Sequence, residues 1–201
     1  MNRLIIIGAS GHGKVVADIA KKNGYQDIVF LDNDKNIKKC LDFPVLGSDS
    51  MVSDLDGDLF VAVGNSSVRK RITEREKGRF FPVLIHPDAV IADDVVIGAG
   101  SVVMAGSVIN PGATIGKGCI INTCSSVDHD CFVDDYCHIS VGAHLAGTVK
   151  VGKETWIGAG AIVSNNLDIC GGCKIGAGAV VVKSIYEPGT YVGVPSKKIS
   201  E

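Results

Sequence analysis

A histidine beside a carboxylate, His129 next to Asp130, is the pair of residues in this sequence best suited to acid–base chemistry. A neutral imidazole can remove a proton from an attacking amine or hydroxyl, and a neighbouring carboxylate can hold its tautomer. Gly147, eighteen residues further on, offers a backbone N–H that no side chain shields, and such a group can stabilise an oxyanion. Base, carboxylate and amide together suit acyl transfer. For His129 taken alone, a solvent-exposed histidine without function is the alternative.

These residues lie within a long repeat that must set their positions. Every sixth residue from Ile85 to Val181 is aliphatic, without an interruption. These anchors are Ile85, Ile91, Ile97, Val103, Ile109, Ile115, Ile121, Val127, Val133, Ile139, Leu145, Val151, Ile157, Val163, Ile169, Ile175 and Val181. The residue four places after an anchor is mostly small or β-branched, and glycine is frequent close behind the anchor. Such fixed-period similarity indicates a repeat architecture.

The repeat predicts a parallel β-helix. Strands of four or five residues would alternate with corners where glycine accepts the backbone angles, and the anchors would point inward. If three hexapeptides form one coil, residues eighteen apart stack as neighbouring strands, about 4.8 Å apart. His129 then lies beneath Gly147, and His138 lies beneath Trp156. The repeat alone does not give the handedness of the helix.

Residues 1–82 differ from the repeat and predict a small Rossmann-like α/β domain. Strands are expected near residues 4–7, 28–31, 59–63 and 82–84, and helices over residues 14–22 and 68–77. A glycine-rich turn, Gly8 to Gly13, leads into the first helix. Free N–H groups and the helix dipole favour phosphate at such a position. Residues 83–201 form the second expected domain.

The turn departs from the dinucleotide fingerprint, because Ser10 stands where the middle glycine would be. Asp32-Asn33 and Gly64-Asn65 follow two other strands and are expected at the same edge of the sheet. A mononucleotide or nucleotide sugar therefore fits this half-sized unit better than NAD. Glycines that merely make tight packing turns are the alternative.

Composition places the chain among globular proteins. Its net charge is −2 and its apolar content is 46%, so no basic face for nucleic acid is expected. There is no signal-peptide pattern and no apolar run of about 18 residues, so we expect a cytoplasmic protein. Four of the seven cysteines, Cys119, Cys131, Cys137 and Cys173, occupy the small inward position of the repeat and should pack like alanine or serine. Cys40, Cys124 and Cys170 lie off this position, and none is expected to have a CxxC partner.

Several motifs together resemble one family. They are the turn Gly8-Ala9-Ser10-Gly11-His12-Gly13, Ile121-Asn122-Thr123, Val127-Asp128-His129-Asp130, Ala146-Gly147 and the tail Gly193-Val194-Pro195-Ser196-Lys197. With the repeat, they resemble the sugar O-/N-acetyltransferases of the left-handed β-helix superfamily. The nearest relatives acetylate UDP-4-amino-4,6-dideoxy sugars on the way to bacillosamine-type glycans. The resemblance covers nearly the whole chain and implies an α/β Rossmann-like N-terminal domain followed by an all-β left-handed parallel β-helix.

The resemblance also implies roles for single residues. The protein would be a homotrimer that uses acetyl-CoA, needs no metal, and has active sites between subunits. His129 would be the general base and Asp130 would raise its basicity, although the nearest relatives usually carry Glu there. Asn122 would line the sugar site, and His138 with the Gly147 amide would lie at the thioester. Ala159 and Ala177 would follow the pantetheine, and the tail around Pro195 and Lys197 would lie near the CoA nucleotide. The nucleotide-sugar contacts would be Ser10, Gly11, His12, Asp32, Asn33, Gly64 and Asn65.

Other functions stay open at this point. An O-acetyltransferase acting on a sialic-acid-like sugar would use the same base, and transfer through an acyl group on Cys124 is a minor variant. A zinc lyase of the carbonic-anhydrase type also uses this helix but needs three converging histidines. A nucleotide-sugar-binding subunit without catalytic activity is a further alternative. The sugar and its nucleotide are not given by the sequence.

Overall fold

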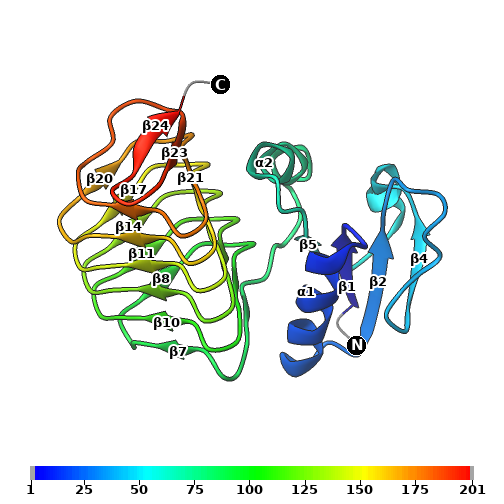
Figure 1. Ribbon diagram of the computed structural model, residues 1–201. Coiled ribbons are helices and arrows are strands. Elements are labelled where there is room, and N and C mark those ends of the chain that lie inside the picture. The colour runs from blue at the N-terminus through cyan, green and yellow to red at the C-terminus, as the bar shows by residue number, and fades with distance from the viewer. Residues whose placement is uncertain (1–2, 200–201) are drawn as a thin grey trace. The chain divides into compact units, whose positions relative to one another are not determined.

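The computed structural model describes residues 3–199, which form two compact units, one ending at His86 and the other beginning at Pro87. Figure 1 shows the α/β elements of the first unit and the stacked coils of the second. No helix in the described part of the chain is long and apolar enough to cross a bilayer.

The first unit is a small sheet with two α-helices. Its strand order is β3-β4-β2-β1-β5, and β4, β2, β1 and β5 run parallel. The strands of this sheet are β1 (Arg3–Ile7), β2 (Asp27–Leu31), β3 (Lys39–Cys40), β4 (Phe43–Gly47) and β5 (Asp58–Val61). A further strand, β6 (Leu84–Ile85), follows later in the chain and is not part of this sheet. The helices are α1 (Gly11–Lys22), α2 (Ser66–Arg75) and the 3-10 helix η1 (Asp49–Asp54). This is the Rossmann-like arrangement that the sequence predicts.

The apolar runs of the first unit form its core. Ile5, Val29 and Leu59, from three adjacent strands, are all buried, and Ile72 of α2 packs with them. The prediction left out β3, β4 and η1. In β4 the residues alternate only between half-buried and exposed, because this strand lies near the edge of the sheet. Its five residues include a proline and a glycine, which weaken the sequence signal for a strand.

The second unit is the predicted parallel β-helix, whose strands form three sheets. The first sheet contains β7 (Val90–Ile91), β10 (Val108–Ile109), β13 (Ser126–Val127), β16 (His144–Leu145), β19 (Ile162–Val163) and β22 (Val180–Val181). The second contains β8 (Val96–Ile97), β11 (Thr114–Ile115), β14 (Phe132–Val133), β17 (Lys150–Val151) and β20 (Asp168–Ile169). The third contains β9 (Val102–Val103), β12 (Ile120–Ile121), β15 (His138–Ile139), β18 (Trp156–Ile157) and β21 (Lys174–Ile175), followed by β23 (Thr190–Val192) and β24 (Lys197–Ile199). The fold is a left-handed β-helix.

The strand register confirms the stacking of residues eighteen apart. Val108 pairs with Ser126, for example, and His138 with Trp156. The anchors from Val103 to Val181 are all buried, which confirms that they point inward. The expected strand length is wrong, because each strand of the repeat, from β7 to β22, has only two residues. The remaining four residues of each hexapeptide make the corner.

The corners need left-handed backbone angles at one position. Glycine supplies many of them, as predicted, but Asp130 (φ 57°) and Thr148 (φ 61°) take the same conformation. Aspartate adopts this region more readily than most residues. The carboxylate of the candidate pair is therefore attached to a backbone that the corner already fixes.

The inward cysteines are buried, as expected, but they also form hydrogen bonds. The Cys119 thiol lies 3.1 Å from the carbonyl oxygen of Asp134, and the Cys137 thiol lies 3.2 Å from that of Gly152. Burial raises the pKa of the Cys137 thiol. The expectation that Cys170 has no CxxC partner is wrong, because only two glycines separate it from Cys173 and their Sγ atoms lie 3.5 Å apart.

Candidate active site

His129 and Asp130 lie at the corner between β13 and β14, on the edge of the β-helix where the first sheet meets the second. We call this the His129 edge. His129 Nδ1 lies 2.8 Å from Asp130 Oδ2. A carboxylate oxygen can only accept, so Nδ1 carries the proton and Nε2 keeps a lone pair. The hydrogen bond to Asp130 raises the pKa of His129, and the charge of Asp128 adds to it. An imidazole with a free lone pair and a raised pKa has the chemistry that a general base requires.

A second carboxylate, which the sequence prediction did not include, holds the same corner. Asp128 Oδ1 accepts a hydrogen bond from the His129 backbone N–H at 2.8 Å and another from Asn110 Nδ2 at 2.7 Å. The Asn110 bond, followed by the backbone bond, lowers the pKa of Asp128. Asn110 lies eighteen residues before Asp128 and therefore one coil below it. The stacking of residues eighteen apart could have predicted this contact from the sequence. Asp128 therefore fixes the backbone that carries the candidate base.

Gly147 lies one coil above His129, as the sequence predicts. The backbone N–H of Thr148 donates to the carbonyl oxygen of His129 at 2.9 Å. A Cβ atom at Gly147 would overlap His129 Nε2 and lie 2.6 Å from its Cε1. Only glycine therefore leaves room for the imidazole in this position. Within residues 3–199 nothing accepts a hydrogen bond from the Gly147 N–H, so this donor is available to a ligand.

A second group of predicted residues follows another edge of the β-helix, where the third sheet meets the first. We call it the Asn122 edge. Asn122 lies at the corner after β12, and its Nδ2 is 3.0 Å from Nε2 of His138 on β15. The His138 ring stacks on Trp156 of β18, as predicted, with centroids 5.6 Å apart and planes 6° apart. Ala159 and Ala177 are exposed at successive corners of this edge, where the Gly178 N–H donates to the Ala159 carbonyl at 2.8 Å.

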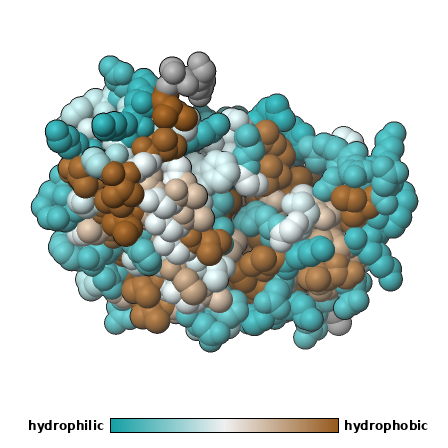
Figure 2. All heavy atoms as spheres, in the orientation of Figure 1, coloured by the Kyte–Doolittle hydropathy of each residue, from teal (hydrophilic) through white to brown (hydrophobic). Residues whose placement is uncertain are grey.

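The structure therefore divides the predicted acyl-transfer residues into two sets. His129, Asp130 and Gly147 lie together on one edge, and Asn122, His138, Ala159 and Ala177 lie on or beside the other. The first sheet separates the two edges within one chain. Figure 2 shows apolar side chains, in brown, at several places on the surface. The exposed apolar residues of this unit include Ile162 of the first sheet and Phe132 of the second.

The glycine-rich turn of the first unit presents backbone donors. Ser10 is the N-cap of α1 but makes no capping hydrogen bond through its side chain. Within residues 3–199 no acceptor is found for the N–H groups of Gly11, His12 and Gly13. Two positions of this turn, Gly8 (φ 107°) and Gly13, require glycine for structural reasons, because a Cβ at either would collide with backbone carbonyl atoms. The N–H groups left open match the anion site that the sequence predicts.

The other predicted nucleotide contacts surround this turn, and several also hold the loops. Asp32 Oδ2 accepts from the Ala9 N–H at 2.7 Å, and Asn33 Oδ1 from the Asp49 N–H at 3.3 Å. Asn65 is the N-cap of α2, accepting from the Val68 N–H at 3.0 Å. The carbonyl of Gly64 accepts from Arg69 at 3.0 Å.

Arg69 is a further residue of this site that the sequence prediction missed. Its side chain is buried, at 1% exposure, and its Nη1 also donates to the Val63 carbonyl at 2.7 Å. Burial, and then the charge of Arg69, lowers the pKa of His12 to about 4. His12 Nε2 is buried and has no hydrogen-bond partner in the described part of the chain. A neutral imidazole and a buried cation therefore stand beside the open N–H groups of α1.

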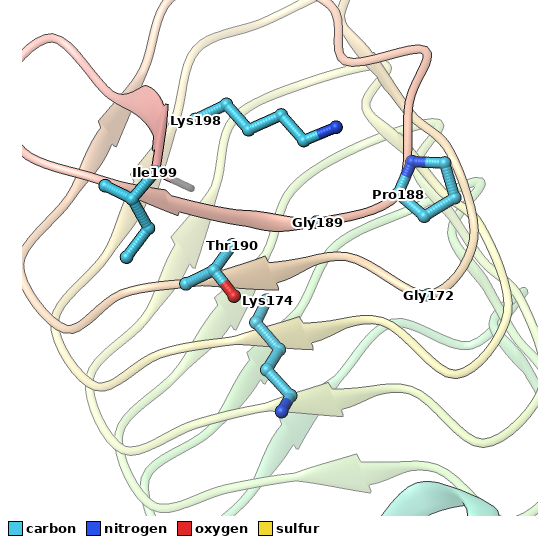
Figure 3. Close-up of a pocket in the computed structure, with 7 residues that line it drawn as sticks. All are labelled: Gly172, Lys174, Pro188, Gly189, Thr190, Lys198 and Ile199. Carbon is cyan, nitrogen blue, oxygen red and sulfur yellow. The ribbon is translucent and has the colours of Figure 1, made fainter. Parts of the chain in front are cut away.

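Three hollows lie near predicted binding residues. One of about 260 Å³ in the first unit is lined by Asp32, Asp34, Ile37, Val45 and Ser48, among others. A second, of about 380 Å³, lies at the C-terminal end of the β-helix and includes Pro195 and Lys197. A third, of about 450 Å³, is lined by Lys174, Lys198, Thr190 and their neighbours (Figure 3). No group of His, Cys, Asp or Glu side chains within residues 3–199 is arranged to hold a metal ion.

The chain is similar to a known protein family and to several solved structures. Residues 3–75 match the family model described as the PglD N-terminal domain. The whole chain is similar to the acetyltransferase domain of PglB from Neisseria gonorrhoeae FA1090, at 43% identity and a TM-score of 0.95, covering 99% of this chain and 100% of that one. That domain is also known in complex with acetyl coenzyme A.

A second similar structure is PerB from Caulobacter crescentus in complex with CoA and GDP-perosamine. It is 34% identical with a TM-score of 0.93, covering 100% of this chain and 98% of that one. Among curated proteins, the serine acetyltransferase of Buchnera aphidicola subsp. Acyrthosiphon pisum is 45% identical over 49 residues. The match spans 24% of this chain and only 18% of that protein.

Proposed function

Because this chain belongs to the family of nucleotide-sugar N-acetyltransferases built on a left-handed β-helix, we propose that it transfers acetyl from acetyl-CoA directly to the amine of a nucleotide-linked amino sugar. The acceptor we favour is a UDP-4-amino-4,6-dideoxy-N-acetylglucosamine type of sugar, as the sequence resemblance implies. The observation that carries the proposal is the His129–Asp130 pair beneath Gly147.

In the proposed reaction the sugar amine attacks the thioester carbonyl carbon. A C–N bond forms, the C–S bond breaks, and CoA leaves as its thiolate or thiol. The lone pair on His129 Nε2 takes the proton that the amine loses, and the Asp130 carboxylate stabilises the imidazolium that results. The open Gly147 N–H is placed to stabilise the negative charge on the carbonyl oxygen. No acyl-enzyme is needed, so Cys124 has no part in the reaction.

The cofactor is proposed to run along the Asn122 edge. Ala159 and Ala177 are exposed there, and their small side chains leave room for pantetheine against the backbone. The two hollows at the C-terminal end carry Lys174, Lys197 and Lys198, whose ammonium groups suit the phosphates of CoA. The acetyl-CoA and CoA complexes of the two similar structures support this co-substrate.

The first unit is proposed to bind the nucleotide of the acceptor. A diphosphate suits the open N–H groups at the start of α1, close to Ser10, Gly11 and His12. Asp32 accepts a hydrogen bond from Ala9 of this turn, and the Gly64 carbonyl accepts one from Arg69. Asn33 and Asn65 follow these two residues directly in the chain, and all four are proposed as contacts of the nucleotide. The GDP-perosamine bound to PerB supports a nucleotide sugar as the class of acceptor.

We also infer a homotrimer whose active sites lie between subunits. Within one chain His129 and Gly147 follow one edge and His138 follows another, with the first sheet between them. A second copy that places its Asn122 edge against the His129 edge of the first would complete the site. The uncharged outward residues Val90, Val108, Ile162 and Val180 of the intervening sheet suit such a contact.

The decisive test is replacement of the base. His129→Ala should lower kcat/KM for acetyl transfer to a UDP-amino sugar by about 10²–10⁴-fold, since that is the usual contribution of a general base. Cys124→Ser is the matched control and should keep wild-type rates, because direct transfer needs no thiol. Survival of His129→Ala activity within about tenfold of wild type would refute the role of this residue.

Acceptor identity needs a separate experiment. Release of CoA would be measured with UDP-, GDP- and CMP-linked sugars carrying either a free amine or only hydroxyls. Transfer to the amine of one nucleotide sugar is the expected result. Transfer to a hydroxyl of a sialic-acid-like sugar, with none to an amine, would favour the O-acetyltransferase alternative, because the same base can serve both acceptors.

A further inference from the structure

The side chain of Asn122 has its orientation fixed by the backbone. Its Oδ1 accepts a hydrogen bond from the Thr123 N–H at 2.8 Å. A backbone N–H can only donate, so the amide oxygen must face Thr123 and the amide nitrogen must face the other way. That nitrogen, Nδ2, lies 3.0 Å from His138 Nε2. The Asn122 amide therefore donates to His138 and cannot accept from it.

This orientation determines the protonation of the His138 ring. Nε2 must offer a lone pair to the Asn122 donor, so the ring is neutral and its proton resides on Nδ1. An imidazolium would bring an N–H against the amide N–H and lose the bond. The contrast with His129 is direct, because there a carboxylate holds Nδ1 and leaves the Nε2 lone pair free.

Trp156 fixes the plane of the same ring. Its indole lies parallel to the imidazole, and its Nε1–H donates to Ser140 Oγ at 2.5 Å. Ser140 is buried, at 5% exposure, whereas the indole itself is 47% exposed. The buried hydroxyl thus holds an exposed aromatic ring in one orientation. Rotation of His138 away from Asn122 would cost the stacking contact with Trp156.

We propose that Asn122 and Trp156 are positioning residues that keep His138 neutral, with its proton on Nδ1 and its lone pair occupied. Only one of the two imidazoles is then able to act as a base. The proton released in the reaction goes to His129, and the surface next to the thioester carries no second base and no imidazolium. The catalytic part of this inference rests on the proposed function; the tautomer itself does not.

Nitrogen-15 NMR of histidine-labelled, ligand-free protein tests the tautomer without any assay of transfer. The His138 signals should show a protonated Nδ1 and an unprotonated Nε2 at pH 7, whereas His129 should titrate in the same pH series. A wild-type His138 that is protonated on Nε2 at pH 7 would overturn the proposal. This measurement needs no variant, so a folding defect cannot obscure it.

Variants then test the two positioning residues. In Asn122→Asp the new carboxylate can only accept, so Nε2 of His138 should become protonated, and kcat should fall by about tenfold or more with a second inflection in its pH profile. Trp156→Phe should preserve the tautomer and most of the activity, and Trp156→Ala should average the two tautomer signals. Tyr186→Ala, which removes another exposed aromatic ring, is the matched control.

The outcomes separate the two proposals. An unchanged His138 signal in Asn122→Asp would refute the inference even if transfer is lost. The expected signals combined with full activity of His129→Ala would leave the tautomer in place and refute the proposed role of His129 instead.

Discussion

Replacing Gly147 by alanine tests the contact between the two coils that carry the candidate base and the candidate oxyanion donor. The added Cβ would lie 2.6 Å from His129 Cε1 and 3.0 Å from its Cδ2, and would overlap Nε2. Ordinary contact begins near 3.4 Å, so the ring must move by about 1 Å to clear its nearest atom, Nε2. The backbone itself is not strained by the change, because Gly147 is not among the residues with positive φ.

The expected loss follows from that displacement. A shift of about 1 Å in a reacting group can lower the rate by about 10²-fold, so we expect kcat/KM of Gly147→Ala to fall by about 100-fold. The ring would also move relative to Asp130, to which its Nδ1 is hydrogen-bonded at 2.8 Å. Since the side chain of His129 is 58% exposed, it can move without disturbing the core, and the unfolding midpoint should change by less than about 2 °C.

The assay is the initial rate of CoA release with a UDP-amino sugar, together with thermal unfolding of each variant. Gly78→Ala is the matched control, because a Cβ at that glycine meets no atom within 4 Å. It should keep both the rate and the midpoint. A Gly147→Ala enzyme within about threefold of wild-type kcat/KM would show that His129 does not work from the position described here.

Three further predictions concern charge and capping. Asp130→Asn replaces the charged acceptor that raises the pKa of His129 by a neutral amide, so the acid limb of the kcat/KM profile should move to lower pH while the plateau falls; an unmoved limb would contradict the pairing. His12 has its pKa lowered to about 4, so the unfolded state takes up a proton near pH 6.5 before the folded state does. Stability is then complete above pH 6.5 and declines as the pH falls towards 4, by about 2 kcal/mol between pH 7 and pH 5, and His12→Gln should lack this decline in denaturant titrations. Asn65→Ala should cost about 1 kcal/mol of unfolding free energy by removing the N-cap of α2, and Asn65→Ser should restore most of it.

The coil geometry could be predicted from the sequence because it depends on spacing alone. Residues eighteen apart must stack once three hexapeptides close a coil, which placed Gly147 above His129 and Trp156 above His138 before any coordinates. The parallel, Rossmann-like character of the sheet that contains β2, β1 and β5 was predictable from apolar runs and the glycine-rich turn, whereas the order of its strands was not predicted.

Side-chain direction could not be predicted in this way. The Asn122–His138 bond joins residues sixteen apart on a corner and a strand, and it depends on the rotamers of both. Arg69 lies in a polar segment of α2 that reads as a solvent-exposed face, yet it is buried because its guanidinium reaches the Val63 and Gly64 carbonyls. Strand β4 is as long as β1 and β2, but its residues are at most half-buried and include a proline and a glycine, so the sequence signal for a strand is weak.

The unbroken six-residue spacing of inward side chains limits how this protein can change in length. Insertion or deletion of a single residue within residues 85–181 would turn every later anchor out of the core, since burial depends on an uninterrupted count. Adding six residues would restore burial but shift each later face by one third of a circuit. Only insertions of eighteen residues, one full coil, preserve both the burial of the anchors and the face on which each later residue lies. The distance between His129 and the C-terminal end of the β-helix would therefore increase in increments of about 4.8 Å.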